Sequence, residues 1–142
     1  MKATLQQLSP KETKIKFEKI PHEFTVGKIT LADDAWMLNE FGGQAGIVKI
    51  FETGDLRSLV RIFFRLLNND DKLILGKIQL TTVDEDGVES EIKSSIDKLL
   101  YLIQSHETQE LIMALLASRG ASLPDIVDGA DDGKKKQSKL KK

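Results

Sequence analysis

The strongest structural pattern in the chain lies in residues 56–67, with the sequence LRSLVRIFFRLL. Its apolar residues recur at spacings of three and four, which predicts an amphipathic helix, and Asp55 precedes it as a typical N-cap residue. The stripe consists of Leu56, Leu59, Val60, Phe63, Phe64 and Leu67. Ile62 and Leu66 are also apolar but fall outside the stripe. A helix that is apolar on more than one side is either central to its domain or partly covered by a second chain, and both interpretations stay open.

The polar side of the same helix carries Arg57, Arg61 and Arg65 at spacings of four. A basic stripe of this kind could bind phosphate groups, but the chain also holds 22 Asp and Glu residues that could pair with the arginines. We therefore expect a solvated face on which the three arginines form ion pairs with carboxylates.

Two segments that flank Pro21 alternate apolar and polar residues with period two, TKIKFEKI before it and EFTVGKI after it. This alternation is typical of half-buried strands and predicts an N-terminal β-hairpin. Residues 1–13 are largely polar and contain Pro10, so we expect a flexible lead-in there.

The sequence TLADDAWMLNEFGG predicts a helix that begins with a capping box at Thr30 and ends at the two glycines. Leu31, Ala35 and Leu38 share one face of this helix, which we expect to pack on the core. Trp36, the only tryptophan, lies on the same helix. A place in the core or at its edge is favoured over a role as a binding anchor, because tryptophan is usually well buried.

Three further amphipathic helices are predicted in QAGIVKIFETG, EIKSSIDKLLYLIQS and HETQELIMALLASRG. Their apolar stripes are Ile47, Ile50 and Phe51; Ile92, Ile96, Leu99, Leu100 and Ile103; and Leu111, Ile112, Leu115 and Leu116. Ser105 is the expected N-cap of the last helix. The last two helices are expected to pack as an antiparallel pair.

The polar region NNDDKLILGKIQLTTVDEDGVESE admits two interpretations. Ile78 and Leu80 belong either to a strand that turns at Gly87 or to a loop that leads to the next helix. The acidic residues before Gly87 do not form a calcium loop: with Gly87 at its sixth place, Thr82 and Lys93 would stand where carboxylates are needed.

The charge of the chain is unevenly distributed. Six of the 21 basic residues lie in the last nine positions, which leaves 15 basic against 22 acidic residues before them, a charge of −7. We predict one domain over residues 14–128, mainly α with a small N-terminal β-hairpin (α+β), followed by a disordered basic tail over residues 129–142. An acidic body repels phosphate, so nucleic-acid binding is disfavoured.

Composition also excludes several locations and chemistries. No apolar run reaches the roughly 20 residues of a membrane helix, and the opening MKATLQQLSPKETK lacks the apolar core of a secretion signal, so we expect a cytoplasmic protein. The chain has no cysteine, and His22 and His106 stand in no catalytic or metal-binding motif. In GADDGKK the glycine spacing does not match a phosphate-binding loop. We expect a non-enzymatic binding protein without cofactor or metal.

The segment FTVGKITLADDAWMLNEFGGQAGIVKIFETGDLRSLVRIFFRLL, followed by a polar loop and two amphipathic helices, resembles the tail assembly chaperones of long-tailed bacteriophages. The resemblance covers residues 14–128 and is one of pattern and order. It implies a non-enzymatic protein that binds the long helical tape measure protein in the host cytoplasm. There it would keep that protein soluble until tail-tube subunits polymerise around it, and it would be absent from the mature virion.

Surplus apolar surface on the helix after Asp55 would suit such a partner. The candidate partner-binding residues are Ile62, Phe64 and Leu66, with Trp36 as a weaker one, and a buried role for each stays open. Whether the surplus serves self-association or a partner also stays open.

The resemblance further implies a longer product made by programmed ribosomal frameshifting near the end of the reading frame. Gly133, Lys134, Lys135 and Lys136 can be encoded by an A-rich slippery heptamer, which makes this the frameshift region to examine. Two other classes compete with the chaperone hypothesis. One is a small nucleic-acid-associated or regulatory protein that uses its Lys-rich tail, and the other is a structural subunit of a phage-like particle.

Overall fold

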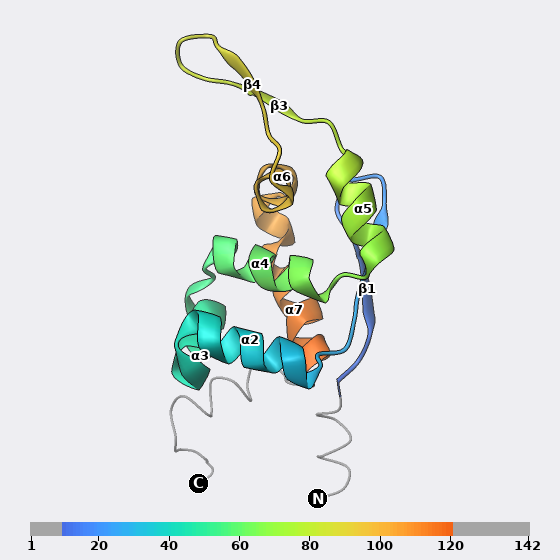
Figure 1. Cartoon of the computed structure of the whole chain (residues 1–142), viewed down its shortest axis with the longest axis vertical. Coiled ribbons are helices and arrows are strands. Elements are labelled where there is room, and N and C mark those ends of the chain that lie inside the picture. Colours follow the sequence, from blue (N-terminus) through green and yellow to red (C-terminus); the bar gives the residue numbers. More distant parts are fainter. Residues whose placement is uncertain (1–9, 121–142) are drawn as a thin grey trace, which may run out of the picture.

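The computed structural model describes residues 10–120 and confirms a mainly helical fold with a small N-terminal hairpin (Figure 1). Residues 1–9 of the expected lead-in, the expected tail and the expected frameshift region lie outside the described residues. In chain order the elements are β1 (Thr13–Lys16), β2 (Glu23–Val26), α2 (Leu31–Phe41), α3 (Gly43–Thr53), α4 (Leu56–Leu66), α5 (Asn69–Lys77), β3 (Thr81–Val83), β4 (Glu89–Glu91), α6 (Ser95–Leu102), the 3-10 turn η1 (Ser105–Glu107) and α7 (Thr108–Arg119).

The N-terminal hairpin pairs β1 with β2 antiparallel, with Thr13 opposite Val26. The residues that its alternation places on one face are buried: Ile15, Phe17, Phe24 and Val26. The segment just before β1 is attached to α7, because the Lys11 N–H donates to the Ala117 carbonyl at 2.9 Å. Lys11, which the sequence placed in the flexible lead-in, is therefore hydrogen-bonded to the body of the domain.

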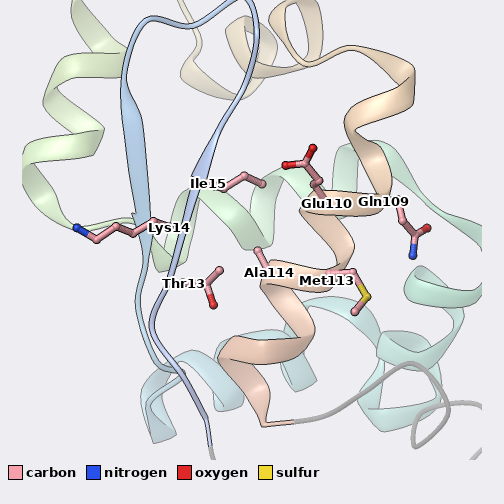
Figure 2. Close-up of a pocket in the computed structure, with 7 residues that line it drawn as sticks. All are labelled: Thr13, Lys14, Ile15, Gln109, Glu110, Met113 and Ala114. Atoms are coloured by element: carbon pink, nitrogen blue, oxygen red, sulfur yellow. The ribbon is translucent and has the colours of Figure 1, made fainter.

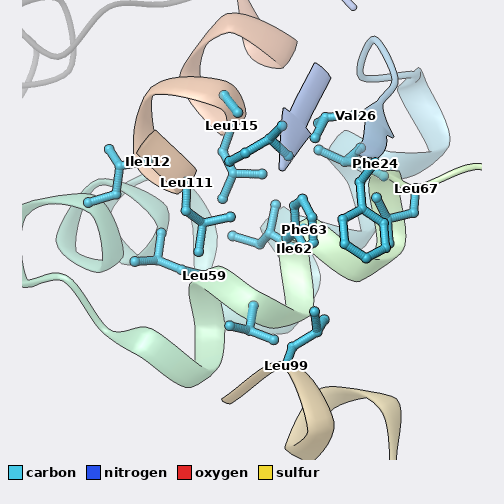
Figure 3. Close-up of a cluster of buried hydrophobic side chains, with 14 of the residues drawn as sticks. Phe24, Val26, Leu59, Ile62, Phe63, Leu67, Leu99, Leu111, Ile112 and Leu115 are labelled. Atoms are coloured by element: carbon cyan, nitrogen blue, oxygen red, sulfur yellow. The ribbon is translucent and has the colours of Figure 1, made fainter. Parts of the chain in front are cut away.

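Helix α4 is central to the domain. It crosses the middle of the molecule, with α2 and α3 on one side and α6 on the other (Figure 1). Figure 3 shows its Leu59, Ile62 and Phe63 among side chains from β2, α6 and α7. The Phe63 ring makes edge-to-face contacts with Phe17 and Phe24, at 5.7 Å between centroids in each case. The extra apolar residues of α4 are therefore explained by packing inside one chain.

The expected face of α2 is wrong. Leu31, Ala35 and Leu38 are exposed, and Met37 is the side chain that enters the core, with Trp36 and Phe41 packed against it. Larger side chains remove more apolar area from water, so the stripe of bulkier residues is the one that is buried. The predicted ends are right: a capping box at Thr30 opens the helix and left-handed Gly42 closes it.

Helix α3 follows its prediction, with Ile47, Ile50 and Phe51 buried and left-handed Gly54 at its end. The Asp55 carboxylate then caps α4 as expected, accepting hydrogen bonds from the backbone N–H of Ser58 at 3.4 Å and its hydroxyl at 2.9 Å. The two residues Gly54 and Asp55 thus separate α3 from α4.

Helix α5 lies in the region for which the sequence predicted only a strand or a loop. Asn68 caps it by accepting from the Asp71 N–H at 2.8 Å. At its other end the Lys98 ammonium, almost fully buried, donates to the Gly76 carbonyl at 2.9 Å and so ties α6 to α5. The strand-and-turn interpretation holds for the next segment, where β3 and β4 form a hairpin, but Ile78 lies at the end of α5 and outside that hairpin.

The last two helices do not form the expected antiparallel pair. Helix α6 packs on α4 and α5, whereas α7 packs on β1 and α4. The residues between them form an extended link and η1, which redirects the chain. Ser105 is not the N-cap: the Glu107 carboxylate instead accepts from the backbone N–H of Gln104 at 2.9 Å and of Glu18 at 2.8 Å. The apolar residues predicted for α7 are buried, namely Leu111, Ile112, Leu115 and Leu116.

Candidate partner-binding surface

Two of the predicted partner-binding residues belong to the core. Ile62 is 1% exposed and Leu66 is 7% exposed, so neither side chain is available to a partner in this fold. The prediction that Ile62 and Leu66 bind a partner is therefore wrong, because α4 lies at the centre of the domain and buries both side chains. Phe64 is half-buried, and the Lys72 ammonium of α5 lies 5.5 Å from its ring centroid.

Trp36 lies at the edge of the core, as the favoured interpretation of the sequence predicted. It projects from α2 toward α4, where the guanidinium of Arg65 lies 5.0 Å and that of Arg61 5.6 Å from its ring centroid. The Phe41 ring meets it edge-on at 5.4 Å. Two cation–π contacts and an aromatic contact therefore fix the ring between the two helices.

The arginine stripe of α4 is paired with carboxylates, as predicted. Arg57 contacts Asp97 at 2.7 Å, Arg61 contacts Glu40 at 2.6 Å and Arg65 contacts Asp33 at 2.9 Å. Exposed ion pairs contribute little each, but these three share one helix and connect it to α2 and α6. All three guanidinium groups are thereby engaged within the domain.

The packing of Trp36 turns an apolar row outward, which we call the α2 stripe: Leu31, Ala35 and Leu38. Spacings of four and three place these residues on one side of the helix. Leu31 is 90% exposed and Leu38 37%. The row adjoins a hollow of about 260 Å³ lined by Ile29, Thr30, Leu31, Asp34 and Arg119. Sequence reasoning missed this surface, and the signal that could have found it was the larger size of the alternative stripe.

A second hollow lies on the surface where β1 meets α7 (Figure 2). Its volume is about 330 Å³, and it is lined by Thr13, Lys14, Ile15, Gln109, Glu110, Met113 and Ala114. Ile15 points toward α7, whereas the Lys14 side chain points away from it. Met113 is half exposed, so the two-stranded sheet leaves part of α7 uncovered.

The histidines take part in structural contacts. His22 Nε2 lies 2.7 Å from Oδ1 of buried Asp71, whose Oδ2 accepts from the Thr25 N–H at 2.8 Å. This network holds the hairpin on α5. His106 is on the surface, as expected, with Nε2 3.4 Å from Glu18 Oε2.

The Glu18 carboxylate has a shifted pKa. A hydrogen bond from Gln104, then the hydrogen bond and charge of His106, hold the pKa of Glu18 below its usual range. Within residues 10–120 no three His, Asp or Glu side chains are arranged to hold a metal ion. None of the helices in that part of the chain is long and apolar enough to cross a membrane.

Comparison of the chain with protein-family models, with curated proteins and with solved structures finds no match. The α2 stripe contains Leu31, which is almost fully exposed, whereas Met113 beside the hollow at β1 and α7 is only half exposed.

Proposed function

We propose that this protein is a non-enzymatic tail assembly chaperone that binds the tape measure protein of a long-tailed bacteriophage through the α2 stripe. The observation that carries the proposal is the outward apolar row on a helix whose other side is fixed to α4 by Trp36. Within residues 10–120 Leu31 is almost fully exposed and Leu38 is more than one third exposed, so both offer apolar surface to another molecule. An apolar row on a rigid helix fits the apolar face of another helix, which is the chemistry of a tape measure protein.

The size of the stripe suits repeated weak contacts. Covering one leucine contributes roughly 1.5–3 kcal/mol, and the loss of rigid-body freedom on binding offsets much of this gain. One copy therefore binds weakly, but many copies along a long helix hide its apolar surface together. Weak individual contacts also allow tail-tube subunits to displace the chaperone in the host cytoplasm, so that it is absent from the finished virion.

Co-expression tests the proposal. A tape measure protein encoded beside this chain is expressed alone and with the full chain, and its soluble fraction is measured after centrifugation. We expect a several-fold larger soluble fraction with the chain present. Equal aggregation with and without the chain would refute the chaperone function.

Finished particles provide a second test, directed at the competing structural role. Mass spectrometry of purified virions should detect tail-tube subunits without this chain. Its presence in a fixed ratio to the tube subunits would identify a structural subunit instead.

A further inference from the structure

The hairpin β3–β4 projects away from the body of the molecule (Figure 1). Within residues 10–120, one side-chain hydrogen bond connects this hairpin to the helices. It joins the Thr82 hydroxyl to the Tyr101 hydroxyl of α6 at 3.4 Å. An isolated two-stranded hairpin is marginally stable in water. Val83 and Val88 on this hairpin are also exposed. A third strand paired with this hairpin would stabilise it.

The hydrogen bonds of this hairpin show which backbone groups face outward. The Ile92 N–H donates to the Leu80 carbonyl at 2.8 Å and the Asp84 N–H to the Val88 carbonyl at 3.0 Å. In an antiparallel ladder such bonded pairs alternate with pairs whose N–H and C=O groups point away from each other. By this alternation Glu89 and Glu91 present their backbone groups at the free edge of β4.

Strand β1 also has a free edge among the described residues. On β2 the Thr25 N–H is directed out of the pair, because it donates to Asp71. Thr25 stands opposite Lys14. Lys14, and Lys16 two residues on, therefore present their N–H and C=O groups at the free edge of β1. Among residues 10–120 neither N–H donates outside the hairpin.

The two free edges match in spacing and in charge. The edge of β1 presents the backbone groups of two lysines that are two residues apart. The edge of β4 presents those of two glutamates with the same spacing. We propose that β4 of a second copy of this chain adds antiparallel to β1, with Glu91 opposite Lys14 and Glu89 opposite Lys16. Opposite charges in directly facing positions stabilise such pairing, and strand addition to an exposed edge supplies the backbone hydrogen bonds.

The added strand would extend the sheet over α7. Because paired residues project to the same side, the lysine and glutamate side chains share the outer face, away from Glu110. Ser90 then lies on the side of Ile15, above the hollow in Figure 2, and covers the exposed part of Met113. Its small side chain fits between strand and helix.

The contact joins different surfaces of the two copies. Reciprocal exchange of hairpins closes a dimer, and one-way addition leaves a free edge and a free hairpin for further copies. The inference stands without the proposed function, because it concerns this chain alone.

Charge exchange tests the contact in the full chain. Lys14→Glu with Lys16→Glu makes both edges acidic, and Glu89→Lys with Glu91→Lys makes both basic. Sedimentation velocity over a concentration series should show self-association of the parent chain, weakened about tenfold or more in each variant. Mixing the two variants should restore association, because each edge then meets its opposite. Lys49→Glu with Glu52→Lys, at two exposed positions on α3, is a control for charge reversal away from the edges that leaves the net charge unchanged, and circular dichroism checks the fold.

Three results of the association experiments would overturn the inference. The first is a parent chain that stays monomeric at all concentrations, and the second is a mixture that associates no better than either variant. The third is an association lost on Lys134→Glu, Lys135→Glu and Lys136→Glu but kept by both edge variants, which would make the basic tail the partner. Amide hydrogen exchange gives the backbone readout: the N–H groups of Lys14 and Lys16 should become protected on association, and unchanged exchange would exclude strand addition.

Discussion

The Arg65 guanidinium lies 5.0 Å from the Trp36 ring centroid while its Nε donates to Asp33 Oδ1 at 2.9 Å. Both contacts join α4 to α2, and together they set the rotation of α2 about its own axis. Trp36 faces α4, so Leu31 and Leu38 face the solvent. The proposed partner surface is thus a consequence of this anchoring contact.

Trp36→Ala should lower the free energy of unfolding by about 2 kcal/mol, because a half-buried aromatic ring and two cation–π contacts are lost. Chemical denaturation measures the change. The control is Tyr101→Ala on α6, where the aromatic side chain is more exposed than Trp36. This change should cost less than about 0.5 kcal/mol of unfolding free energy. Equal effects of the two changes would contradict the anchoring role of Trp36.

Ile62→Ala and Leu31→Gln separate core from surface. The first should destabilise the protein by roughly 2–5 kcal/mol, because it leaves a cavity beside Phe63. The second should change the unfolding free energy by no more than about 0.5 kcal/mol, because Leu31 already lies in water. Thermal unfolding of both variants checks this, and an Ile62→Ala variant as stable as the parent would place Ile62 outside the core.

Asp71→Ala should cost roughly 2–3 kcal/mol, because the buried carboxylate accepts from both His22 and the Thr25 N–H. Denaturant unfolding measures the loss. Asp70→Ala is the matched control on the exposed side of α5 and should change stability little. A loss of similar size at both positions would show that the network around Asp71 contributes nothing specific.

The lowered pKa of Glu18 predicts a pH effect. Since the folded-state value is depressed, the contribution to stability is present above the unfolded pKa of about 4.3 and is lost as the pH falls through the folded value. An NMR titration of the side-chain carboxyl should place its midpoint below that of an ordinary glutamate. Gln104→Ala should move the midpoint upward, because the hydrogen bond at 2.7 Å is removed. An unmoved midpoint would refute the assigned cause.

The elements with strong local signals could be predicted from the sequence. The stripe of α4, the alternation of β1 and β2 and the caps at Thr30 and Asp55 depend on neighbouring residues, so they are readable without the fold. The ion pairs of Arg57, Arg61 and Arg65 followed from the excess of carboxylates.

Features that depend on distant contacts could not be predicted. Helix α2 carries two apolar rows, and the row with Trp36 is held by Arg61 and Arg65 of α4, which follows it in the sequence. Helix α5 was missed because it is held by one buried leucine, Leu75, and by polar contacts of Asp71 and Lys98 with other elements. The expected pairing of α6 and α7 was wrong because each helix packs on other elements, α6 on α4 and α5, and α7 on β1 and α4.

The central claim concerns the α2 stripe, and matched apolar surfaces allow a direct test. Leu31→Gln with Leu38→Gln removes the stripe, whereas Leu73→Gln with Ile74→Gln removes two residues of α5 that are 65% and 37% exposed. Glutamine is a good helix former, so both variants should keep the fold. The measurement is the soluble fraction of the co-expressed tape measure protein. We predict that it falls to the level without chaperone for the α2 variant and stays at the parent level for the α5 variant. Full solubility with the α2 variant would contradict the account.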